Sequence, residues 1–325
     1  MKLFFFSFLF ISFQSFSQTT DSNYLSQKEV KKAVDQISKF IRKQSIVTDS
    51  LKWREIDREV EQISTTVKSK DDLEKINNYF TKQLRKAGDK HSFFLTGKRV
   101  DKIKSESQEG KQAESRYLEN GVGYIKVPAL LTFDGEKDKH FANNIRRQIQ
   151  TLDTEHMITG WVVDLRHNTG GNMWPMLAGL NALIEDGIVG YFVYPASKKN
   201  IAWKSTNGNI TFTGLKVDTY KIKNQQVKIA VLIDSLTASS GEMTAISFSG
   251  LPNVRFFGTP SGGYTTANIT IPLLYGNILN LAASYVADRN HKEFMDKIIP
   301  DEIVTSTDKS KDETLGMAAK WLGRE

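Results

Sequence analysis

The stretch VKIAVLIDSLTASSGE, residues 227–242, joins an apolar run to a turn of small residues. Its first seven residues predict a buried strand, and the residues after the turn have helical spacing. Such a turn exposes a hydroxyl where helix N-terminal N–H groups can stabilise an anionic oxygen. This pattern indicates a serine nucleophile. Thr237 or Ser239 equally suits a plain helix N-cap, with Glu242 closing a capping box.

A second stretch, WVVDLRHNTGG at residues 161–171, also reads as a buried strand that runs into a turn. Paired glycines after a strand let the backbone aim its N–H groups at a ligand, as an oxyanion hole requires. Taken alone, the stretch also fits a tight strand-to-helix turn with an ion pair between Asp164 and Arg166. Two such turns in one chain favour a hydrolase site.

Together the two stretches resemble the C-terminal processing, or tail-specific, serine protease family, whose members carry D-L-R-x-N-x-G-G and T-A-S-A-S/G-E runs. GVGYIKV at residues 121–127 and IPDEIV at residues 299–304 are similar to the family's opening strand and closing turn. The resemblance covers roughly residues 117–305. It implies an α/β fold, with a parallel-rich sheet covered by helices, which is the ClpP/crotonase-like protease core.

The resemblance also implies the roles of individual residues. The family's nucleophile matches Ser239, and its oxyanion donors match the backbone N–H groups of Ser240 and of a glycine in the Gly170–Gly171 pair. Glu242 matches the glutamate beside the nucleophile, as a supporting or orienting group. The implied reaction is hydrolysis of peptide bonds through an acyl-enzyme.

The base departs from the commonest family pattern. Many members have a lysine in the run that matches GTPSGGYTT at residues 258–266, but Tyr264 stands at that position. A tyrosine with an unperturbed pKa of about 10 is a poor base at neutral pH. GDKHS at residues 88–92 resembles a run of the lysine-free branch, related to the tricorn core protease and to interphotoreceptor retinoid-binding protein. This resemblance implies that His91, with an unperturbed pKa of about 6.5, is the base.

The group that would orient His91 is left open, because Lys90 stands where the lysine-free branch has a serine. Carboxylates elsewhere in the chain are candidates, namely Asp89, Glu242, Glu293 and Asp296. The remaining histidines are interpreted as bystanders, namely His140, His156, His167 and His291.

The first residues predict a signal peptide spanning residues 1–17. Lys2 precedes an apolar stretch, Leu3 to Phe13, that is too short to span a bilayer, and Ser15 and Ser17 stand before Gln18 where a signal peptidase reads small residues. The chain has no cysteine, so it has no lipid-attachment site and no disulfide. We therefore expect an exported, periplasmic protein without stable membrane insertion after cleavage; extracellular or cell-surface release stays open.

Three further segments are expected after the signal peptide. Residues 18–96 predict a helical domain of about three helices that ends in the His91 motif. Residues 97–116 are polar and predict a linker or flap, too short for the PDZ domain that many relatives carry there. Residues 117–325 predict the protease core, with hairpins near residues 201–220 and 265–285.

Charge and composition limit the partners. The net charge is +7, but basic and acidic residues alternate along residues 28–90, which is typical of solvated helix faces. We therefore expect a peptide or unfolded protein as substrate, no nucleic acid, no cofactor and no metal. The sequence predicts an exported serine endopeptidase that acts on unstructured segments or C-terminal tails. The alternative is a catalytically silent module of the same fold that binds a peptide or an apolar small molecule.

Overall fold

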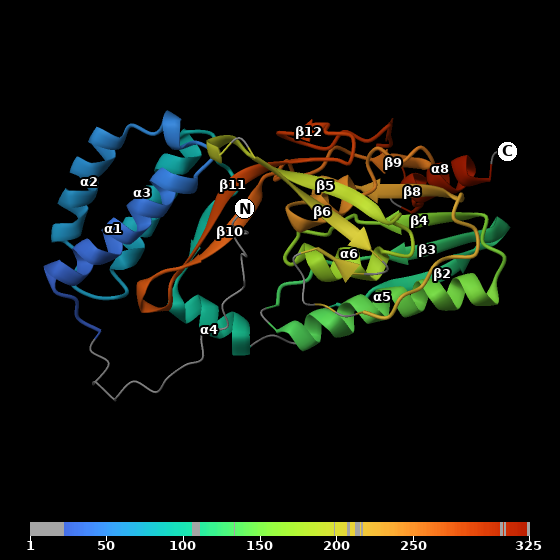
Figure 1. Cartoon of the computed structure of the whole chain (residues 1–325), viewed down its shortest axis with the longest axis horizontal. Coiled ribbons are helices and arrows are strands. Elements are labelled where there is room, and N and C mark those ends of the chain that lie inside the picture. Colours follow the sequence, from blue (N-terminus) through green and yellow to red (C-terminus); the bar gives the residue numbers. More distant parts are fainter. Residues whose placement is uncertain are drawn as a thin grey trace, which may run out of the picture.

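A six-stranded sheet forms the centre of the larger half of the molecule in the computed structural model (Figure 1). The structure describes residues 23–105, 111–132, 134–197, 199–206, 209–211, 215, 217–305, 308 and 310–323. The strand order is β13 (Glu302–Ile303), β9 (Val254–Gly258), β8 (Lys228–Ile233), β4 (Gly160–Asp164), β3 (Val122–Lys126) and β2 (Glu114–Leu118). All neighbours pair in parallel except β2, which is antiparallel to β3.

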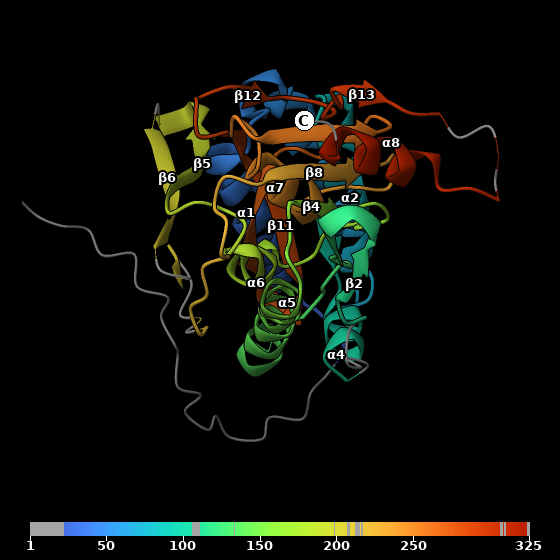
Figure 2. The same ribbon diagram turned by 90° about the vertical axis from the view of Figure 1, so that its right-hand side faces the viewer.

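The central strands are apolar because both faces of the sheet are covered. Trp161 and Val163 of β4 face the main core, whereas Val162 between them belongs to the cluster on the opposite face. Helices α5 (Gly135–Glu155), α6 (Met173–Leu180) and α7 (Ser240–Ile246) contribute to the main core. Helix α8 (Glu313–Leu322) covers the other face, as Figure 2 shows.

Helix α8 is held by a short ion-pair chain. Arg166 donates to the buried carboxylate of Asp164 with Nε and Nη2, and to Asp312, at the N-terminus of α8, with Nη1 and Nη2. Tyr124 donates its hydroxyl to the same Asp164 carboxylate at 2.7 Å. The ion pair between Asp164 and Arg166 foreseen in the sequence is therefore present, and it extends to the last helix.

A second hydrophobic core lies among the N-terminal helices, which are drawn at the left of Figure 1. These are α1 (Gln27–Gln44), α2 (Trp53–Thr65) and α3 (Leu73–Lys86), with a short 3-10 turn, η1 (Thr48–Ser50), between the first two. Helix α1 begins at a capping box formed by Ser26 and Glu29. Each helix is amphipathic, so its apolar stripe packs inward and its charged face stays in water.

An antiparallel sheet connects the two cores. It contains β1 (Phe93–Leu95), β5 (Gly187–Tyr194), β6 (Lys199–Thr206), β7 (Asn209–Ile210), β10 (Ala267–Pro272), β11 (Ile278–Ala287) and β12 (Glu293–Phe294). Strand β11 pairs with β1 and β10 at its beginning, where Leu279 and Leu281 pack in the N-terminal core. Its end pairs with β5 and β12, and Val286 there belongs to the main core.

The fold class is confirmed, including the small N-terminal helical region. The expected polar linker differs in detail, because residues 97–105 form helix α4 (Gly97–Ser105) and β2 begins at Glu114. Helix α4 buries Val100, and at its start the N–H of Gly97 donates to the side chain of Asn277 at 3.0 Å, so a segment distant in the sequence contacts this part of the polar stretch. The signal-peptide prediction lies outside the described residues, and the domain boundaries stay predictions. No described helix is long and apolar enough to cross a membrane.

Candidate active site

Ser239 lies in a strained turn between β8 and α7. Its backbone has φ 53° and ψ −121°, a positive-φ conformation that residues with a side chain rarely adopt. The turn is held on both sides: the N–H of Ser239 donates to Glu242, and the carbonyl of neighbouring Ala238 closely approaches Gly170. Strain of this kind is found at functional sites when surrounding contacts enforce it.

His91 is positioned by the turn that follows α3. The Asp89 carboxylate accepts the backbone N–H groups of His91 and Ser92, each at 2.9 Å, and also the Ser92 hydroxyl. That hydroxyl accepts the N–H of Ala282 in β11, so the turn is fixed to the connecting strand. Asn268 donates to the His91 carbonyl. The aspartate of the GDKHS run therefore shapes the backbone and does not bond to the imidazole.

The two candidate residues meet across the boundary between the cores. The distance from His91 Nε2 to Ser239 Oγ is 2.9 Å, although the residues are 148 positions apart in the sequence. A nucleophile and a base within about 2.6–3.2 Å have the geometry that proton transfer requires. The structure therefore brings together the serine and the histidine that the sequence singled out separately.

Thr266 occupies the other side of the imidazole. Its Oγ1 lies 2.9 Å from His91 Nδ1. For Nε2 to accept a proton from Ser239, Nδ1 must carry the ring proton, so Thr266 acts as the acceptor. No described carboxylate bonds to this nitrogen. The orienting group is therefore a neutral hydroxyl, which sequence reasoning missed, because a threonine two residues after Tyr264 carries no pattern that marks it.

Burial controls the charge of the imidazole. Desolvation lowers the pKa of His91 below 6.5, while the nearby Asp89 charge and a hydrogen bond with the Thr266 backbone oppose the shift. The ring of Tyr264 adds to the enclosure, since it packs edge-on at 5.5 Å between ring centroids. His91 is therefore neutral at pH 7, as a general base must be.

Two backbone N–H groups remain available beside Ser239. Ser240 is the first residue of α7, so its N–H has no acceptor within the helix. The N–H of Gly170 donates to Asn168 Oδ1 at 3.0 Å and is already used. Gly171 is the alternative, and its N–H shares a peptide group with the Gly170 carbonyl, which accepts the N–H of Leu130 at 3.1 Å. The Ser240 hydroxyl donates to the Gly171 carbonyl, in the next peptide group, at 2.6 Å. Of the two candidate glycines, only Gly171 has an N–H that bonds to no acceptor among the described residues.

A β-carbon at either glycine would disrupt this turn. At Gly170 it would lie 2.8 Å from the β-carbon of Ser239, and at Gly171 it would lie 1.9 Å from the carbonyl oxygen of Leu130. Both glycines also have positive φ, 108° and 111°. The glycine pair is thus required by close approach as well as by backbone conformation.

Glu242 supports the nucleophile and does not touch the base. Its fully buried carboxylate accepts the N–H groups of Ser239, Gly263 and Tyr264, and the Ser261 hydroxyl. Burial raises the pKa of Glu242, and these four donors oppose the shift. The carboxylate therefore joins the turn of Ser239 to the loop that carries Tyr264.

The other carboxylates and histidines considered from the sequence do not bond to His91 or to Ser239. Asp296 is exposed and pairs with Lys90 at 3.6 Å, and Glu293 lies on β12. Among the bystander histidines, His156 stacks on Tyr117, His291 stacks on Tyr191, and His167 pairs with Asp234 at 3.2 Å. Within the described part of the chain, no group of three or more His, Asp or Glu side chains could hold a metal ion.

Replacing Thr266 with valine is expected to lower kcat about tenfold, corresponding to about 1.4 kcal/mol in the barrier. Valine preserves the shape but removes the acceptor for Nδ1–H, so the imidazole loses its preferred tautomer and orientation. The contribution of Thr266 to the pKa of His91 comes from its backbone, which valine retains, so the acid limb of kcat/KM should keep its midpoint while kcat falls. Steady-state kinetics against pH measures both effects.

The matched control is Thr266→Ser, which keeps the hydroxyl and should retain most of the activity. A valine variant with unchanged kcat would show that the Thr266 hydroxyl does not position His91.

Comparison with known proteins identifies a peptidase family, a relative in sequence and solved structures that are similar to this chain. The sequence model of peptidase family S41 matches residues 121–304. A nisin-resistance protein from Lactococcus lactis subsp. lactis is 32% identical over 308 residues, covering 92% of this chain and 89% of the relative. A solved lipoprotein from Streptococcus agalactiae has a TM-score of 0.76 at 26% identity, over 95% of this chain and 99% of its own. A solved protein from Parabacteroides merdae ATCC 43184, 17% identical, shares the fold with a TM-score of 0.56 over 92% of this chain and 97% of its own.

Proposed function

Since the chain belongs to peptidase family S41, we propose that it is a serine peptidase in which Ser239 is the nucleophile and His91 the base. The observation that carries this proposal is the 2.9 Å contact between His91 Nε2 and the hydroxyl of Ser239, a residue held at positive φ. A residue that served only as a helix cap would need neither the strain nor the histidine.

The proposed reaction follows from these positions. Ser239 Oγ attacks the peptide carbonyl while its proton passes to His91 Nε2, and the N–H groups of Ser240 and Gly171 stabilise the oxyanion. The protonated His91 then gives its proton to the leaving amine as the C–N bond breaks. Water, deprotonated by His91, attacks the acyl-enzyme and releases the new carboxylate and the free Ser239.

Exposed apolar side chains beside this centre support an apolar peptide as substrate. Leu131 is 60% exposed and adjoins the bridge between Leu130 and Gly171. Leu236, 49% exposed, precedes the nucleophile in the same turn, and Tyr264 covers His91. Large apolar groups exposed around a site favour binding of apolar ligand groups.

The relatives narrow the substrate and the location. The Lactococcus lactis relative is named for resistance to nisin, so we propose nisin as a substrate, beside the apolar peptides that the exposed side chains favour. The description of the Streptococcus agalactiae relative as a lipoprotein supports a place in the cell envelope, with export through the predicted signal peptide. Recognition of C-terminal tails stays a prediction.

The test combines covalent labelling with hydrolysis. A fluorophosphonate probe should label Ser239, located by mass spectrometry of the digested protein, and the purified protein should cleave nisin or an unstructured apolar peptide. Labelling of Ser239 with cleavage of apolar peptides but not nisin would reject nisin alone as a substrate, and cleavage of polar peptides only would reject the apolar substrate class. Neither labelling nor cleavage across a broad peptide set would favour the silent binding module.

A further inference from the structure

Basic residues outnumber acidic ones in one segment of the N-terminal half. Residues 75–105, which include most of α3 and all of α4, contain nine basic and two acidic residues. One of those two acids, Asp89, is buried and already accepts two backbone N–H groups. The remainder of the chain has equal numbers of basic and acidic residues, so this segment alone accounts for the net charge of +7. The alternation of charges along residues 28–90 therefore ends within α3.

Part of this charge lies on one face of α3, among the helices at the left of Figure 1. An open hollow of about 470 Å³ on the helix is lined by Asn78, Thr81, Lys82, Arg85 and Lys86. Residues three and four positions apart share one side of a helix, so the three cations project together. All three are exposed, because the opposite side of α3 packs in the N-terminal core. A partner can therefore reach them from solvent.

These three cations have no acidic partner. No described carboxylate forms an ion pair with Lys82, Arg85 or Lys86, whereas Lys75 and Lys98 each pair with an aspartate. The helix dipole favours cations in the last turn, which accounts for Arg85 and Lys86 but not for Lys82. Lys82 also stands three and four positions before the other two, where like charges repel and destabilise a helix. An anionic partner would relieve this repulsion.

The cationic face has a border on the side of α2. Glu59 of α2 bonds to the Tyr79 hydroxyl, and the charge of Glu55 also acts on it. Tyr79 follows Asn78 in the sequence, so these acidic groups lie beside the hollow and do not line it. The anionic partner is therefore confined to α3 and the segment that follows it.

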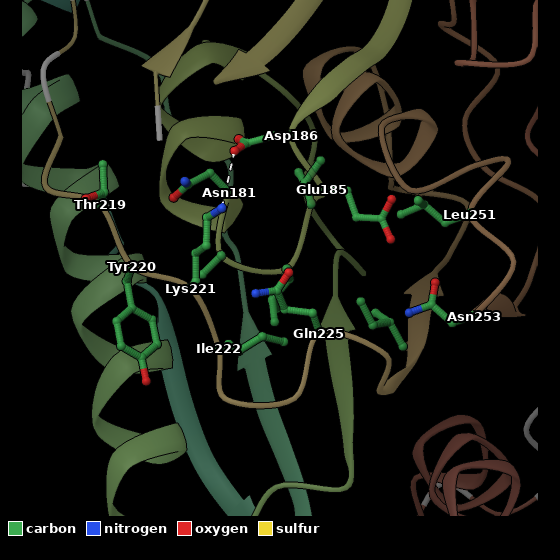
Figure 3. Close-up of a pocket in the computed structure, with 14 residues that line it drawn as sticks. Asn181, Glu185, Asp186, Thr219, Tyr220, Lys221, Ile222, Gln225, Leu251 and Asn253 are labelled. Atoms are coloured by element: carbon green, nitrogen blue, oxygen red, sulfur yellow. Dashed lines mark ion pairs between the residues drawn. The ribbon is translucent and has the colours of Figure 1, made fainter. Parts of the chain in front are cut away.

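A cavity in the larger half of the molecule has a different charge. It has a volume of about 530 Å³ and is drawn in Figure 3. Two carboxylates, Glu185 and Asp186, line it beside one cation, Lys221, which pairs with Asp186 at 3.8 Å. A negatively charged ligand is repelled there, so of these two hollows only the one on α3 suits an anion.

Phosphate groups suit the hollow on α3. An arginine guanidinium binds a phosphate through two parallel N–H bonds, and lysine ammonium groups beside it add charge. The aliphatic stems of Lys82 and Lys86 let their charged ends reach outward to an interface. The surplus of charge extends over α3 and α4, well beyond the hollow. A surface that offers many phosphates therefore satisfies more of this charge than one small anion does.

We propose that the face of α3 formed by Asn78, Lys82, Arg85 and Lys86 docks on the anionic phospholipid headgroups of a membrane. The docking is electrostatic and needs no insertion of the chain. It goes beyond the proposed catalytic function and holds even if Ser239 performs no chemistry. His91 follows Lys86 by five residues, so docking would place the reaction centre close to the membrane surface.

Sedimentation with lipid vesicles tests the proposal. The protein used begins at Gln18, which removes the apolar stretch of the predicted signal peptide and keeps every described residue. It should bind vesicles of equal parts phosphatidylcholine and phosphatidylglycerol, and should bind pure phosphatidylcholine weakly. Each Lys or Arg at an anionic surface contributes about fivefold to binding, so the triple variant Lys82→Gln, Arg85→Gln, Lys86→Gln should lose about 100-fold. Glutamine removes the charge and preserves helix propensity.

The matched control changes the same number of charges on the core. Lys139→Gln, Lys199→Gln and Lys320→Gln are exposed substitutions on α5, β6 and α8, and together they should keep most of the binding. Added salt should weaken binding of the unmodified protein more than binding of the α3 variant. The thermal midpoints of both triple variants should match that of the unmodified protein. If the α3 variant melts early, Lys82→Gln alone decides, with an expected loss of about fivefold.

Three results would overturn the proposal. Equal binding to both kinds of vesicle would show that the headgroup charge is not recognised. Equal losses in the two triple variants would mean that net charge acts without a particular face. Release of the protein from vesicles by hexaglutamate, at a carboxylate concentration no higher than that of lipid phosphate, would identify an acidic protein segment as the partner. Each of these results would leave the proposed peptidase function intact.

Discussion

Replacing Ser239 with alanine is expected to lower kcat on an unstructured apolar peptide by about 10⁴- to 10⁶-fold, as loss of the nucleophile does in serine proteases. The hydroxyl bonds to His91, and the turn itself is held by the Ser239 backbone N–H, which donates to the Glu242 carboxylate. Alanine has a β-carbon like serine, so the positive φ is neither relieved nor worsened. The variant should therefore keep its thermal midpoint while losing hydrolysis and probe labelling.

Ser240→Ala is the matched control, because it removes a neighbouring hydroxyl and keeps its backbone N–H. The lost bond from Ser240 Oγ holds the Gly171 carbonyl, in the peptide group next to the one that carries the proposed Gly171 N–H donor, so a drop of no more than about tenfold in kcat is expected. Steady-state kinetics and probe labelling of both variants decide the assignment. An inactive Ser240→Ala beside an active Ser239→Ala would shift the nucleophile by one residue.

Replacing His91 with alanine is expected to lower kcat by about 10⁴-fold or more, with a smaller change in peptide binding. The unmodified protein should lose activity on acidification only as the pH falls through a depressed pKa. Desolvation lowers the pKa of His91, so the neutral base persists below pH 6.5, and the acid limb of kcat/KM should have its midpoint below that value.

Two control variants test whether the loss of activity is specific to the imidazole of His91. Tyr264→Phe keeps the edge-on ring contact with His91 and removes the hydroxyl, so its activity and pH profile should stay close to those of the unmodified protein. His156→Ala removes a histidine that stacks on Tyr117 and should leave kcat unchanged. Full activity in His91→Ala, or an acid limb well above pH 6.5, would reject His91 as the base.

Local patterns in the sequence were enough to predict the central elements. The apolar runs that became β4 and β8 are followed by small residues and helical spacing, so the strand-turn-helix order around Ser239 and the glycine pair follows from short-range periodicity. The same reasoning located the N-terminal helices, whose apolar positions recur at helical intervals.

Contacts between distant segments could not be predicted in this way. Thr266 reaches His91 from 175 positions away, and nothing about a threonine near a strand marks it as a hydrogen-bond acceptor. The use of the Gly170 N–H by Asn168 depends on turn geometry, which left both glycines open as oxyanion donors in the sequence. Glu242 was recognised as a neighbour of the nucleophile, but its bonds to the Tyr264 loop appear only in the folded chain.

The division of the site between two hydrophobic cores has a consequence for biosynthesis. The histidine is made 148 residues before the serine, and each is held by a different core, joined through β11. A nascent chain that has folded only its first helices therefore has the proposed base without the proposed nucleophile and should not digest itself or its neighbours. The proposed peptide hydrolysis should begin only when synthesis and docking are complete, and on heating it should disappear with the first of the two cores to melt.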